Sequence, residues 1–596
     1  MSETDGMTGS AAAREPASGV GGAKGSRAFV GHARLIGFLT LISRILGMGR
    51  EAIAAHYFGD GLVWSAFTVA FTIPNLFRKL FGEGALSAAF IPLYAAAVKR
   101  EADGGDGAAG LEGAVEMSAG DFAAASVNLL AAILLALTVL GEGLLWALAI
   151  IGDPRPDRLL MIKLTAIMLP YVVLVCGTAF LGAILQVHRK FGAPAAAPVI
   201  LNVVHIAVIA VGAKLMHLTA TSANPNDPQL MARQTTLAYW LAGFVLVAGA
   251  LQMALLLPDL KRVGFRFRWV RHFWTGAIRR MLKLSLPVAL GAGVLQLSVL
   301  LDTGISFLLT PSPNAAGQIA THFSLLGQVF KYPMEMGAPA RLKWAQFLYQ
   351  FPLGIFAIAL ATAIFPGLSR DAADKDRTRF RGVMRHGIEM TLLEGLPASI
   401  GLILVATPAI QLLFQHGKFT SEATAWVARS LVFYSAAIWA FSLQQILNRA
   451  YYALHNTITP LVLSIITLVV NTLVELPMVW TRLGESGMAA GTCISFILQA
   501  LLMLYLLDRK IGGLELGKSA GNIVKMLIAT ALMTGACIAV KYSPIYPKVA
   551  AHRSQAALQL ALLLAVGAGV YFAACAGMGI PGLSELVPKR LRRKAP

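Results

Sequence analysis

The most prominent feature of the chain is a succession of long apolar runs, separated by short polar or basic segments. A helix needs about 20 apolar residues to cross the hydrocarbon core of a bilayer. We therefore expect an all-α polytopic membrane protein. Applied to this sequence, that length predicts fourteen membrane-spanning helices, at residues 33–57, 62–98, 122–152, 159–187, 194–216, 235–257, 283–310, 342–368, 386–414, 424–453, 459–480, 486–507, 521–541 and 556–578.

Two pairs of stretches indicate an internal repeat among the first twelve predicted spans. The second span contains "IPNLFRKLFGEGALSAAFIPL" and the eighth contains "FPLGIFAIALATAIFPGL", each an apolar stretch bracketed by prolines. The fifth opens with "HRKFGAPAAAPVILNVV" and the eleventh with "YYALHNTITPLVLSIIT". Two six-helix halves around a central cavity are a common transporter plan. We expect a disordered cytoplasmic tail at 1–32, a first lobe at 33–258, a basic cytoplasmic linker at 259–282, a second lobe at 283–508, two further helices within 509–580 and a basic tail at 581–596.

Composition supports the membrane assignment and shows where the charge lies. The chain is 57% hydrophobic and 13% charged, whereas soluble domains carry about 25% charged residues. The net charge of +20 is concentrated beside apolar spans, as in the segment from Lys261 to Lys283, which has eight basic residues and no acid. Basic residues in such positions mark the cytoplasmic side, so we expect both termini to lie there. Because no aromatic-interleaved basic domain or zinc finger accompanies the charge, nucleic acid is not an expected partner.

The chain lacks the motifs of a metalloprotein or a hydrolase. All four cysteines lie in apolar runs, and no CxxC motif or Cys/His cluster is present. We therefore expect neither disulfides nor metal sites. The histidines are scattered, without a Ser-His-Asp or HExxH pattern, so an enzyme is not expected.

Arginines inside the predicted spans indicate a candidate binding site. Arg44 lies near mid-depth in the first span, Arg50 lies nearer its end, and Arg78 lies near the middle of the second span. An arginine facing lipid at mid-membrane costs at least ~2.5–3.5 kcal/mol. We therefore expect these side chains to face a water-filled cavity. Guanidinium groups bind phosphate oxygens bidentately, so the expected ligand is an anion.

Other charged residues in the spans allow a structural interpretation as well as a functional one. Arg50 is equally explained as an anchor at the membrane surface. Lys79 and Glu83 are four residues apart and can pair along a helix, and the rim of the cavity is the alternative position for Glu83. Asp302, in the seventh predicted span, is interpreted either as a ligand of a coupling ion or as a partner in an interhelical hydrogen bond.

Five stretches carry a family resemblance. They are, in chain order, "SRILGMGREAIAAHYFG", "AFTVAFTIPNLFRKLFGEGALSAAFIPLYA", "LGAILQVHRKFGAPAAAPVILN", "LLFQHGKFT" and "LNRAYYALHNTITPLVLS". Together they resemble the MurJ (MviN) lipid II flippase family, which belongs to the multidrug/oligosaccharidyl-lipid/polysaccharide (MOP) exporter superfamily. The resemblance covers residues 33–580.

The resemblance implies a fold, a cargo and a set of binding residues. It implies fourteen helices in two lobes that alternate access across the bacterial inner membrane. The implied cargo is lipid II, an undecaprenyl-pyrophosphate-linked disaccharide-pentapeptide used in peptidoglycan synthesis. Arg44, Arg50, Arg78 and Glu83 stand at the matching motif positions, and cavity arginines of the family are thought to hold the pyrophosphate. No cofactor is implied, although transport can be coupled to the membrane potential or a monovalent ion. The implied partners are lipid II, membrane lipids and proteins of cell-wall synthesis.

The chain departs from the family pattern in the candidate site. Ser65 stands where the family commonly has Asp, and Gln346 and Phe347 stand where it has an Asp-Arg pair. The segment 311–340 is also longer than the usual connection. Either the site works with positive charge from one lobe, or two nearby basic residues, Arg341 and Lys343, supply it from the cavity mouth; we favour the second.

Two alternatives to a lipid II flippase remain open from the sequence. The first is an exporter of drugs or of another polyprenyl-linked glycan, for which cavity carboxylates would be expected. The second is a cell-wall assembly scaffold that does not transport, which the missing Asp-Arg pair would allow. Restoration of growth in a flippase-depleted strain distinguishes the scaffold from a transporter.

Overall fold

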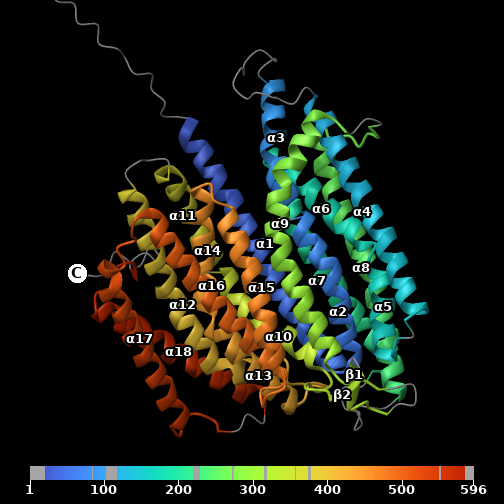
Figure 1. Cartoon of the computed structure of the whole chain (residues 1–596), viewed down its shortest axis with the longest axis vertical. Helices are drawn as coiled ribbons and strands as arrows, with labels where there is room; N and C mark the ends of the chain where they lie inside the picture. The colour runs from blue at the N-terminus through green and yellow to red at the C-terminus, as the bar shows by residue number, and fades with distance from the viewer. Residues whose placement is uncertain are drawn as a thin grey trace, which may run out of the picture.

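The computed structural model describes most of the chain, and almost all of it is helical (Figure 1). The described residues are 21–82, 85–102, 117–152, 154–218, 228–270, 274–313, 318–325, 327–355, 357–372, 377–548 and 552–583.

The helices form two lobes and a C-terminal pair. The N-lobe consists of α1 (Gly21–Phe58), α2 (Leu62–Phe77), the π-helical turn η1 (Arg78–Gly82), α3 (Ala85–Ala102), α4 (Ala119–Ile150), α5 (Pro156–Met168), α6 (Tyr171–Val187), α7 (Gly192–Leu215) and α8 (Pro228–Arg262). The C-lobe consists of α9 (Gly276–Leu308), α10 (Ala338–Ile355), α11 (Ala357–Asp371), α12 (Thr378–Leu413), α13 (Ser421–Ala436), α14 (Ile438–Ala453), α15 (Ile458–Val479) and α16 (Ser486–Ile511). The last two helices are α17 (Gly517–Tyr542) and α18 (Arg553–Gly577), which pack against α12.

Most helices are long and apolar enough to cross a membrane. Nine helices in the described part of the chain meet this condition, or eleven when the bent pairs α5–α6 and α13–α14 each count as one span. The other predicted spans coincide with α1, with α2 to α3 and with α10 to α11, which are more polar or interrupted. The multi-pass helical architecture expected from the sequence is present, and the number fourteen stays a prediction.

Proline and π-helical turns explain the interruptions. Pro74 lies inside α2 just before η1. Because proline has no backbone N–H, it removes one hydrogen bond from the helical ladder. Pro170 stands between α5 and α6, whose axes differ by 42°. In the N-lobe the interruption at η1 places Arg78 on the first residue of an irregular turn, a feature that often occurs at functional sites.

The repeat expected from the sequence appears as matched helix pairs. In the N-lobe, α1 packs against α7, α2 against α5, α6 against α8 and α7 against α8. In the C-lobe, α9 packs against α15, α10 against α13, α14 against α16 and α15 against α16. When the spans of each lobe are numbered from one to six, the packed pairs of the C-lobe have the same numbers as those of the N-lobe. In addition, α9 packs against α2 and α3, so this first C-lobe helix also contacts the N-lobe.

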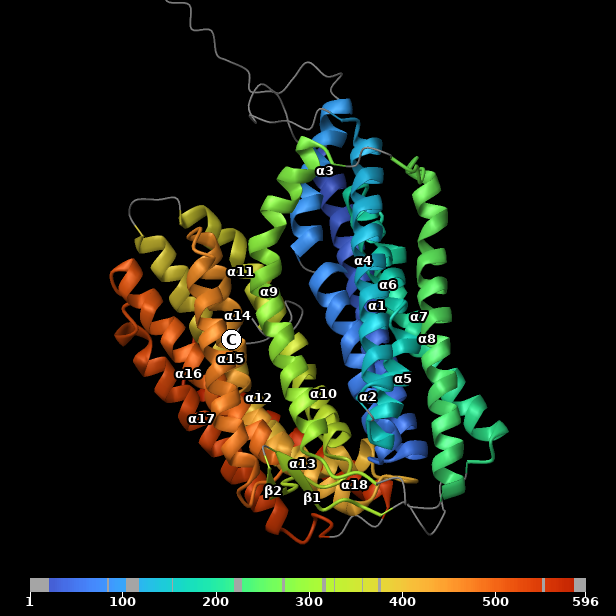
Figure 2. The same ribbon diagram turned by 45° about the vertical axis from the view of Figure 1, so that its right-hand side comes forward.

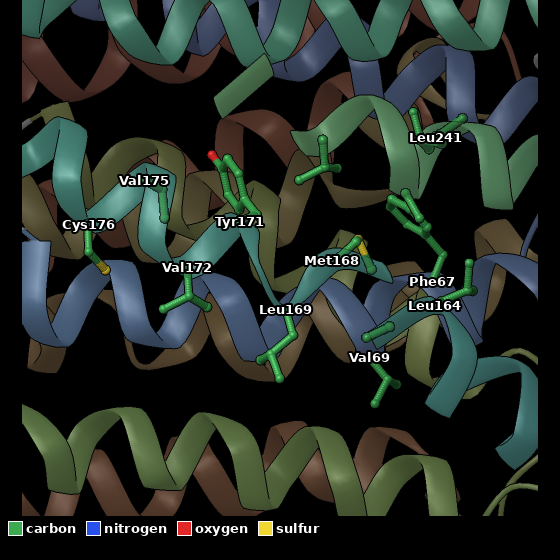
Figure 3. Packing of buried hydrophobic residues seen from close by; sticks show 14 of the residues in the cluster. Phe67, Val69, Leu164, Met168, Leu169, Tyr171, Val172, Val175, Cys176 and Leu241 are labelled. Atoms are coloured by element: carbon green, nitrogen blue, oxygen red, sulfur yellow. The ribbon is translucent and has the colours of Figure 1, made fainter. Parts of the chain in front are cut away.

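The N-lobe core forms where the bent pair α5–α6 meets α2 (Figure 3). Leu164, Met168 and Phe67 are almost completely buried there. Lipid tails are as apolar as these side chains, so close van der Waals packing, rather than removal from water, stabilises such contacts in a membrane. This packing holds α2, and with it η1, in place.

Some element boundaries differ from those expected. Helix α1 begins at Gly21, inside the segment expected to be a disordered tail, because its helical backbone continues beyond the apolar run. Helix α8 continues to Arg262 and α9 begins at Gly276, so both extend into the expected linker 259–282. Most of the expected basic tail, residues 584–596, lies outside the described residues.

The long segment 311–340 contains a β-hairpin. Strand β1 (His322–Leu325) pairs antiparallel with β2 (Gln328–Lys331), with His322 opposite Lys331. The guanidinium of Arg155, which lies between α4 and α5, sits 5.4 Å from the centre of the Tyr332 ring. The segment therefore contacts the N-lobe. Figure 2 shows the two lobes converging at the end of the molecule that carries the hairpin and diverging toward the other end. We call the first the closed end.

Candidate functional site

Helices α1 and α10 meet along a line of contacts between the lobes, which we call the interlobe seam. A methyl group at Gly47 of α1 would lie 4.0 Å from the Phe347 ring of α10. Further toward the closed end, Trp344 Nε1 donates a hydrogen bond to Glu51 Oε2 at 3.1 Å. Residues 44, 47 and 51 share one face of α1 because their spacing follows the helical period. The seam therefore brings that face of α1 against α10.

Arg44 lies at the end of the seam farthest from the closed end. A methyl group at Gly354 of α10 would lie 2.0 Å from one Arg44 guanidinium nitrogen and 2.5 Å from the other. The guanidinium therefore occupies the space that a side chain at residue 354 would fill. Among the described residues it has no hydrogen-bond or ion-pair partner. The sequence prediction that Arg44 points inward is consistent with this position between the lobes.

Arg50 differs from Arg44 because it is already paired. Its Nη2 lies 2.5 Å from Glu51 Oε1, and both side chains are largely buried. The second Glu51 oxygen is held by Trp344, so one carboxylate joins the arginine to the C-lobe. This position favours the inward-facing interpretation of Arg50 over that of an anchor at the membrane surface.

Lys343 brings a C-lobe cation to the same region. The charges of Lys79, Glu51 and Arg50 all act on its ammonium group. Lys343 lies four residues before Phe347 on α10, so the two side chains share a helix face. Lys343 is therefore a C-lobe cation near Arg50 and Glu51, and its use in place of the missing arginine stays a prediction.

Arg78 is held by its own helix. Its Nε donates a 3.0 Å hydrogen bond to Asn75 Oδ1, across the start of η1. The charges of Arg78 and Arg50 both act on the hydroxyl of Tyr171, which places both arginines near the same group. The candidate site thus contains the half-buried cations that the sequence singled out, Arg44, Arg50, Arg78 and Lys343, and Lys79 lies near Lys343 as well.

The positions that we expect to depart from the family pattern carry no charge. Ser65 is 3% exposed, and its hydroxyl has no hydrogen-bond partner in the described part of the chain. Gln346 donates a 3.2 Å hydrogen bond to the hydroxyl of Tyr434 on α13, within the C-lobe. Phe347 instead places its ring against Gly47 in the seam. An aromatic contact between the lobes therefore stands where the resemblance implies an arginine.

Arg341 does not lie with the other cations. It is 3% exposed, and its guanidinium contacts Glu485 Oε2 at 2.5 Å and Asp60 Oδ2 at 2.7 Å. Glu335 lies 3.8 Å away and is more exposed. Asp60 belongs to the N-lobe, whereas Glu485 belongs to the C-lobe. We call Asp60, Arg341 and Glu485 the interlobe ion cluster; it fastens the lobes together at the closed end.

The loop before α13 adds a second contact at the closed end. The rings of His56 and His416 lie 5.2 Å apart, and the backbone N–H of Lys418 donates to the His56 carbonyl at 3.0 Å. A methyl group at Gly417 would lie 2.4 Å from that carbonyl oxygen, so only glycine fits this approach. The pKa of His416 is lowered to about 4, chiefly by burial and also by the nearby charges of Arg553 and His56, whereas a backbone hydrogen bond at Ala52 opposes the shift.

Asp302 belongs to a separate polar cluster between α9 and α15. The side-chain amide of Asn471 donates to Asp302 Oδ1 at 3.0 Å and to Glu475 Oε2 at 3.1 Å. Glu475 is fully buried, and its other oxygen and the Asn471 carbonyl oxygen have no partner in the described residues. The interhelical hydrogen bond expected for Asp302 is present, and oxygens for a cation lie beside it. Within the described ranges, no group of three or more His, Cys, Asp and Glu side chains could hold a metal ion.

Several candidate residues were not predicted from the sequence. Glu475 is the one ionisable residue between 459 and 480 and lies four residues after Asn471, which is a signal that could have been used. Glu51 follows Arg50 directly, but adjacency alone does not indicate pairing. Nothing in a single sequence indicates that Gly354 lies next to Arg44. Glu83 and its expected pairing with Lys79 lie outside the described residues.

Comparison with known proteins identifies relatives over most of the chain. The family model of the lipid II flippase MurJ matches residues 54–544. The probable lipid II flippase MurJ of Rhizobium meliloti (strain 1021) is 30% identical over 569 residues, covering 94% of this chain and 96% of the relative. The lipid II flippase MurJ of Burkholderia cenocepacia is 30% identical over 476 residues, covering 78% and 81% of the two chains.

Solved structures share the fold. A structure of the lipid II flippase MurJ in an inward closed conformation superposes with a TM-score of 0.66 at 22% identity, covering 91% of this chain and 97% of that one. An inward-facing multidrug resistance MATE family transporter of the MOP superfamily has a TM-score of 0.56 at 13% identity, with 80% and 98% covered. At these identities the likeness establishes the fold alone, and the extent of the family match establishes membership. The chain is a multi-pass membrane protein that belongs to the MurJ lipid II flippase family.

Proposed function

We propose that this protein flips lipid II from the inner to the outer leaflet of the bacterial inner membrane by alternating access between its lobes. The supporting observation is the set of four cations near the interlobe seam, in a chain of the MurJ family. A pyrophosphate carries several negative oxygens, and guanidinium forks bind such oxygens bidentately. In this proposal both termini lie in the cytoplasm, so the closed end faces the periplasm.

The four cations have different roles in the proposal. Arg44 has no partner among the described residues, so its guanidinium binds an incoming phosphate without first losing a protein contact. Arg50 is already paired with Glu51, and it contributes mainly positive potential and orientation. Arg78 and Lys343 provide charge from η1 and from the C-lobe. Lys343 thereby replaces the arginine that the family has at the position of Phe347.

Arg341 is assigned to closure rather than to cargo. Its nitrogens are already bonded to two carboxylates, and removing them to bind phosphate would leave Glu485 buried and uncompensated. Such an uncompensated buried charge costs about 3–5 kcal/mol. In the proposal, the contact with Asp60 breaks when the closed end opens, and the contact with Glu485 stays within the C-lobe.

We assign coupling to the cluster of Asp302, Asn471 and Glu475. Two acidic side chains held by one amide in a membrane-spanning region are expensive unless they bind a cation or protons. Because α9 also packs against the N-lobe, a change of charge at Asp302 would alter how α9 sits between the lobes.

A depletion experiment tests the proposed function. Cells depleted of their own flippase are supplied with this chain, and growth and the lipid II exposed on the outer leaflet are both measured. Restoration of both supports lipid II transport. Growth without lipid II exposure would contradict lipid II as cargo, and failure of both, with the protein present in the membrane, would favour the scaffold alternative.

A further inference from the structure

A large apolar groove runs along the N-lobe between α4, α6 and α8. Its volume is about 780 Å³, and none of its lining residues belongs to α1 or α10, so it is separate from the seam. Each of the three helices forms one wall of the groove: Leu134 lies on the α4 wall, Phe180 on the α6 wall and Met253 on the α8 wall. Leu257 on α8 is 48% exposed, which places an apolar side chain of the groove on the outer surface of the lobe.

Two cations lie at one end of this groove. Lys261 and Arg266 are both exposed lining residues, and neither forms an ion pair in the described part of the chain. Arg262, which lies between them, contacts Asp259 at 3.0 Å and does not line the groove. The groove therefore combines long apolar walls with uncompensated positive charge at one end.

Aromatic residues indicate the depth of that end. Phe267 is 61% exposed, Trp269 is 75% exposed and Trp274 is 58% exposed, all in the segment that joins α8 to α9. Trp residues gather where the membrane meets water, so this segment lies at headgroup level. In Figure 2 its described part continues from the end of α8, at the end of the molecule opposite the hairpin. The groove then extends from headgroup level into the hydrocarbon.

The segment is also fastened in position. Asn128 of α4 donates a 3.0 Å hydrogen bond to the carbonyl oxygen of Arg268. Gly264 adopts a positive φ of 79° where the chain turns after α8, which brings Arg266 back over the groove. These contacts hold the charged end of the groove beside α4.

We propose that this groove is a binding site for an anionic phospholipid, with an acyl chain between α4, α6 and α8 and the phosphate beside Lys261 and Arg266. A zwitterionic lipid could use the apolar walls but would gain less from the two cations. A soluble phosphate would gain from the cations but leave the apolar walls unused. The combination of charge and apolar length selects an anionic lipid.

Native mass spectrometry of the purified full-length protein tests the site. The probes are palmitoyl-oleoyl phosphatidylglycerol and phosphatidylcholine, which have the same chains and differ in net charge. We expect the intact protein to bind phosphatidylglycerol about 30-fold more tightly, from the usual contribution of two basic residues near an anionic lipid surface. The double variant Lys261→Gln/Arg266→Gln should lose this preference, and the matched control Arg262→Gln should keep it. Equal affinities in the intact protein, or an unchanged preference in the double variant, would overturn the proposal.

A second pair of variants tests the apolar part. Ala131 lines the groove, whereas the neighbouring Ala132 is exposed outside it. Ala131→Phe should weaken binding of both lipids by about 10-fold or more, because the ring occupies part of the groove. Ala132→Phe should leave binding unchanged, and equal binding by the two variants would contradict the acyl-chain position. Glycerol phosphate should not displace phosphatidylglycerol; displacement at equal concentration would identify a phosphate site instead of a lipid site.

Discussion

Removal of Asp60 from the interlobe ion cluster should shift the protein toward a state that is open at the closed end. Asp60 provides the N-lobe contact of Arg341, at 2.7 Å, while Glu485 holds the same guanidinium from within the C-lobe. Asp60→Ala therefore leaves Arg341 paired with Glu485 and removes the contact by which this cluster joins the two lobes. The fold of each lobe should be little affected.

The size of the shift follows from the type of contact. A hydrogen bond to a charged group contributes about 1.5–3 kcal/mol. Because the Asp60 side chain is 20% exposed, we use the lower end of that range. At about 1.4 kcal/mol for each factor of ten, the ratio of open to closed molecules should rise about 10-fold. Asp60→Asn, which keeps a neutral acceptor, should produce a smaller rise.

Spin-label distances between the lobes measure this ratio. The native cysteines, all within the described residues, are buried, so labels attach selectively to cysteines introduced at the exposed positions Ile151 and Arg482. Glu335→Gln is the matched control, because Glu335 lies 3.8 Å from Arg341 and is 53% exposed. It should leave the distances unchanged. Identical distance distributions in Asp60→Ala and the unmodified chain would refute the assignment of this cluster to closure.

Three further changes test other parts of the account. Gly354→Ala should displace the Arg44 guanidinium and lower lipid II translocation about 10-fold with folded protein unchanged; full activity would show that Arg44 does not act from this position. Phe347→Arg should restore a cation opposite α1 and lower the cargo concentration needed for half-maximal transport; an unchanged value would argue against cargo at this part of the seam. Burial and the charges of Arg553 and His56 at the closed end lower the pKa of His416 to about 4 from an ordinary value of about 6.5. The stabilising effect of neutral His416 on the closed end is therefore complete above the ordinary value and is lost as pH falls toward the lowered one. Spin-label distances should therefore show more open molecules at about pH 5 than at about pH 7, and His416→Gln should remove the difference; a difference that persists would place the titrating group elsewhere.

The periodic features of the fold could be predicted from the sequence. Each predicted span coincides with a helix or a broken helix, because apolar length is encoded locally. The repeat could also be predicted, because similar stretches recur in the second and eighth spans and in the fifth and eleventh spans. The hairpin in 311–340 could not, because its pairing involves two short, largely exposed strands without a long apolar pattern.

The candidate site could be predicted only as a set of unpaired charges. Mid-span arginines indicate a cavity because the membrane makes exposed charge expensive. Their partners are distant in sequence: Arg341 contacts Glu485, 144 positions away, and Trp344 contacts Glu51, 293 positions away. A single sequence gives no information on such pairings. Arg341 and Lys343 are two residues apart in the chain but have different surroundings. The sequence around them does not reveal this difference.

The most direct test of the central claim is the rate at which lipid II appears on the outer leaflet in flippase-depleted cells that carry Arg44 variants. Arg44 has no partner among the described residues, so its substitution should remove a cargo contact without exposing a buried counter-charge. Loss of a bidentate charged contact predicts a rate at least about 10-fold lower for Arg44→Ala at limiting cargo. Arg44→Lys, which keeps the charge without the fork, should fall between Arg44→Ala and the unmodified chain. Ile45→Ala, at an exposed neighbouring position, should transport normally. Normal transport by Arg44→Ala, at equal amounts of protein in the membrane, would contradict the account.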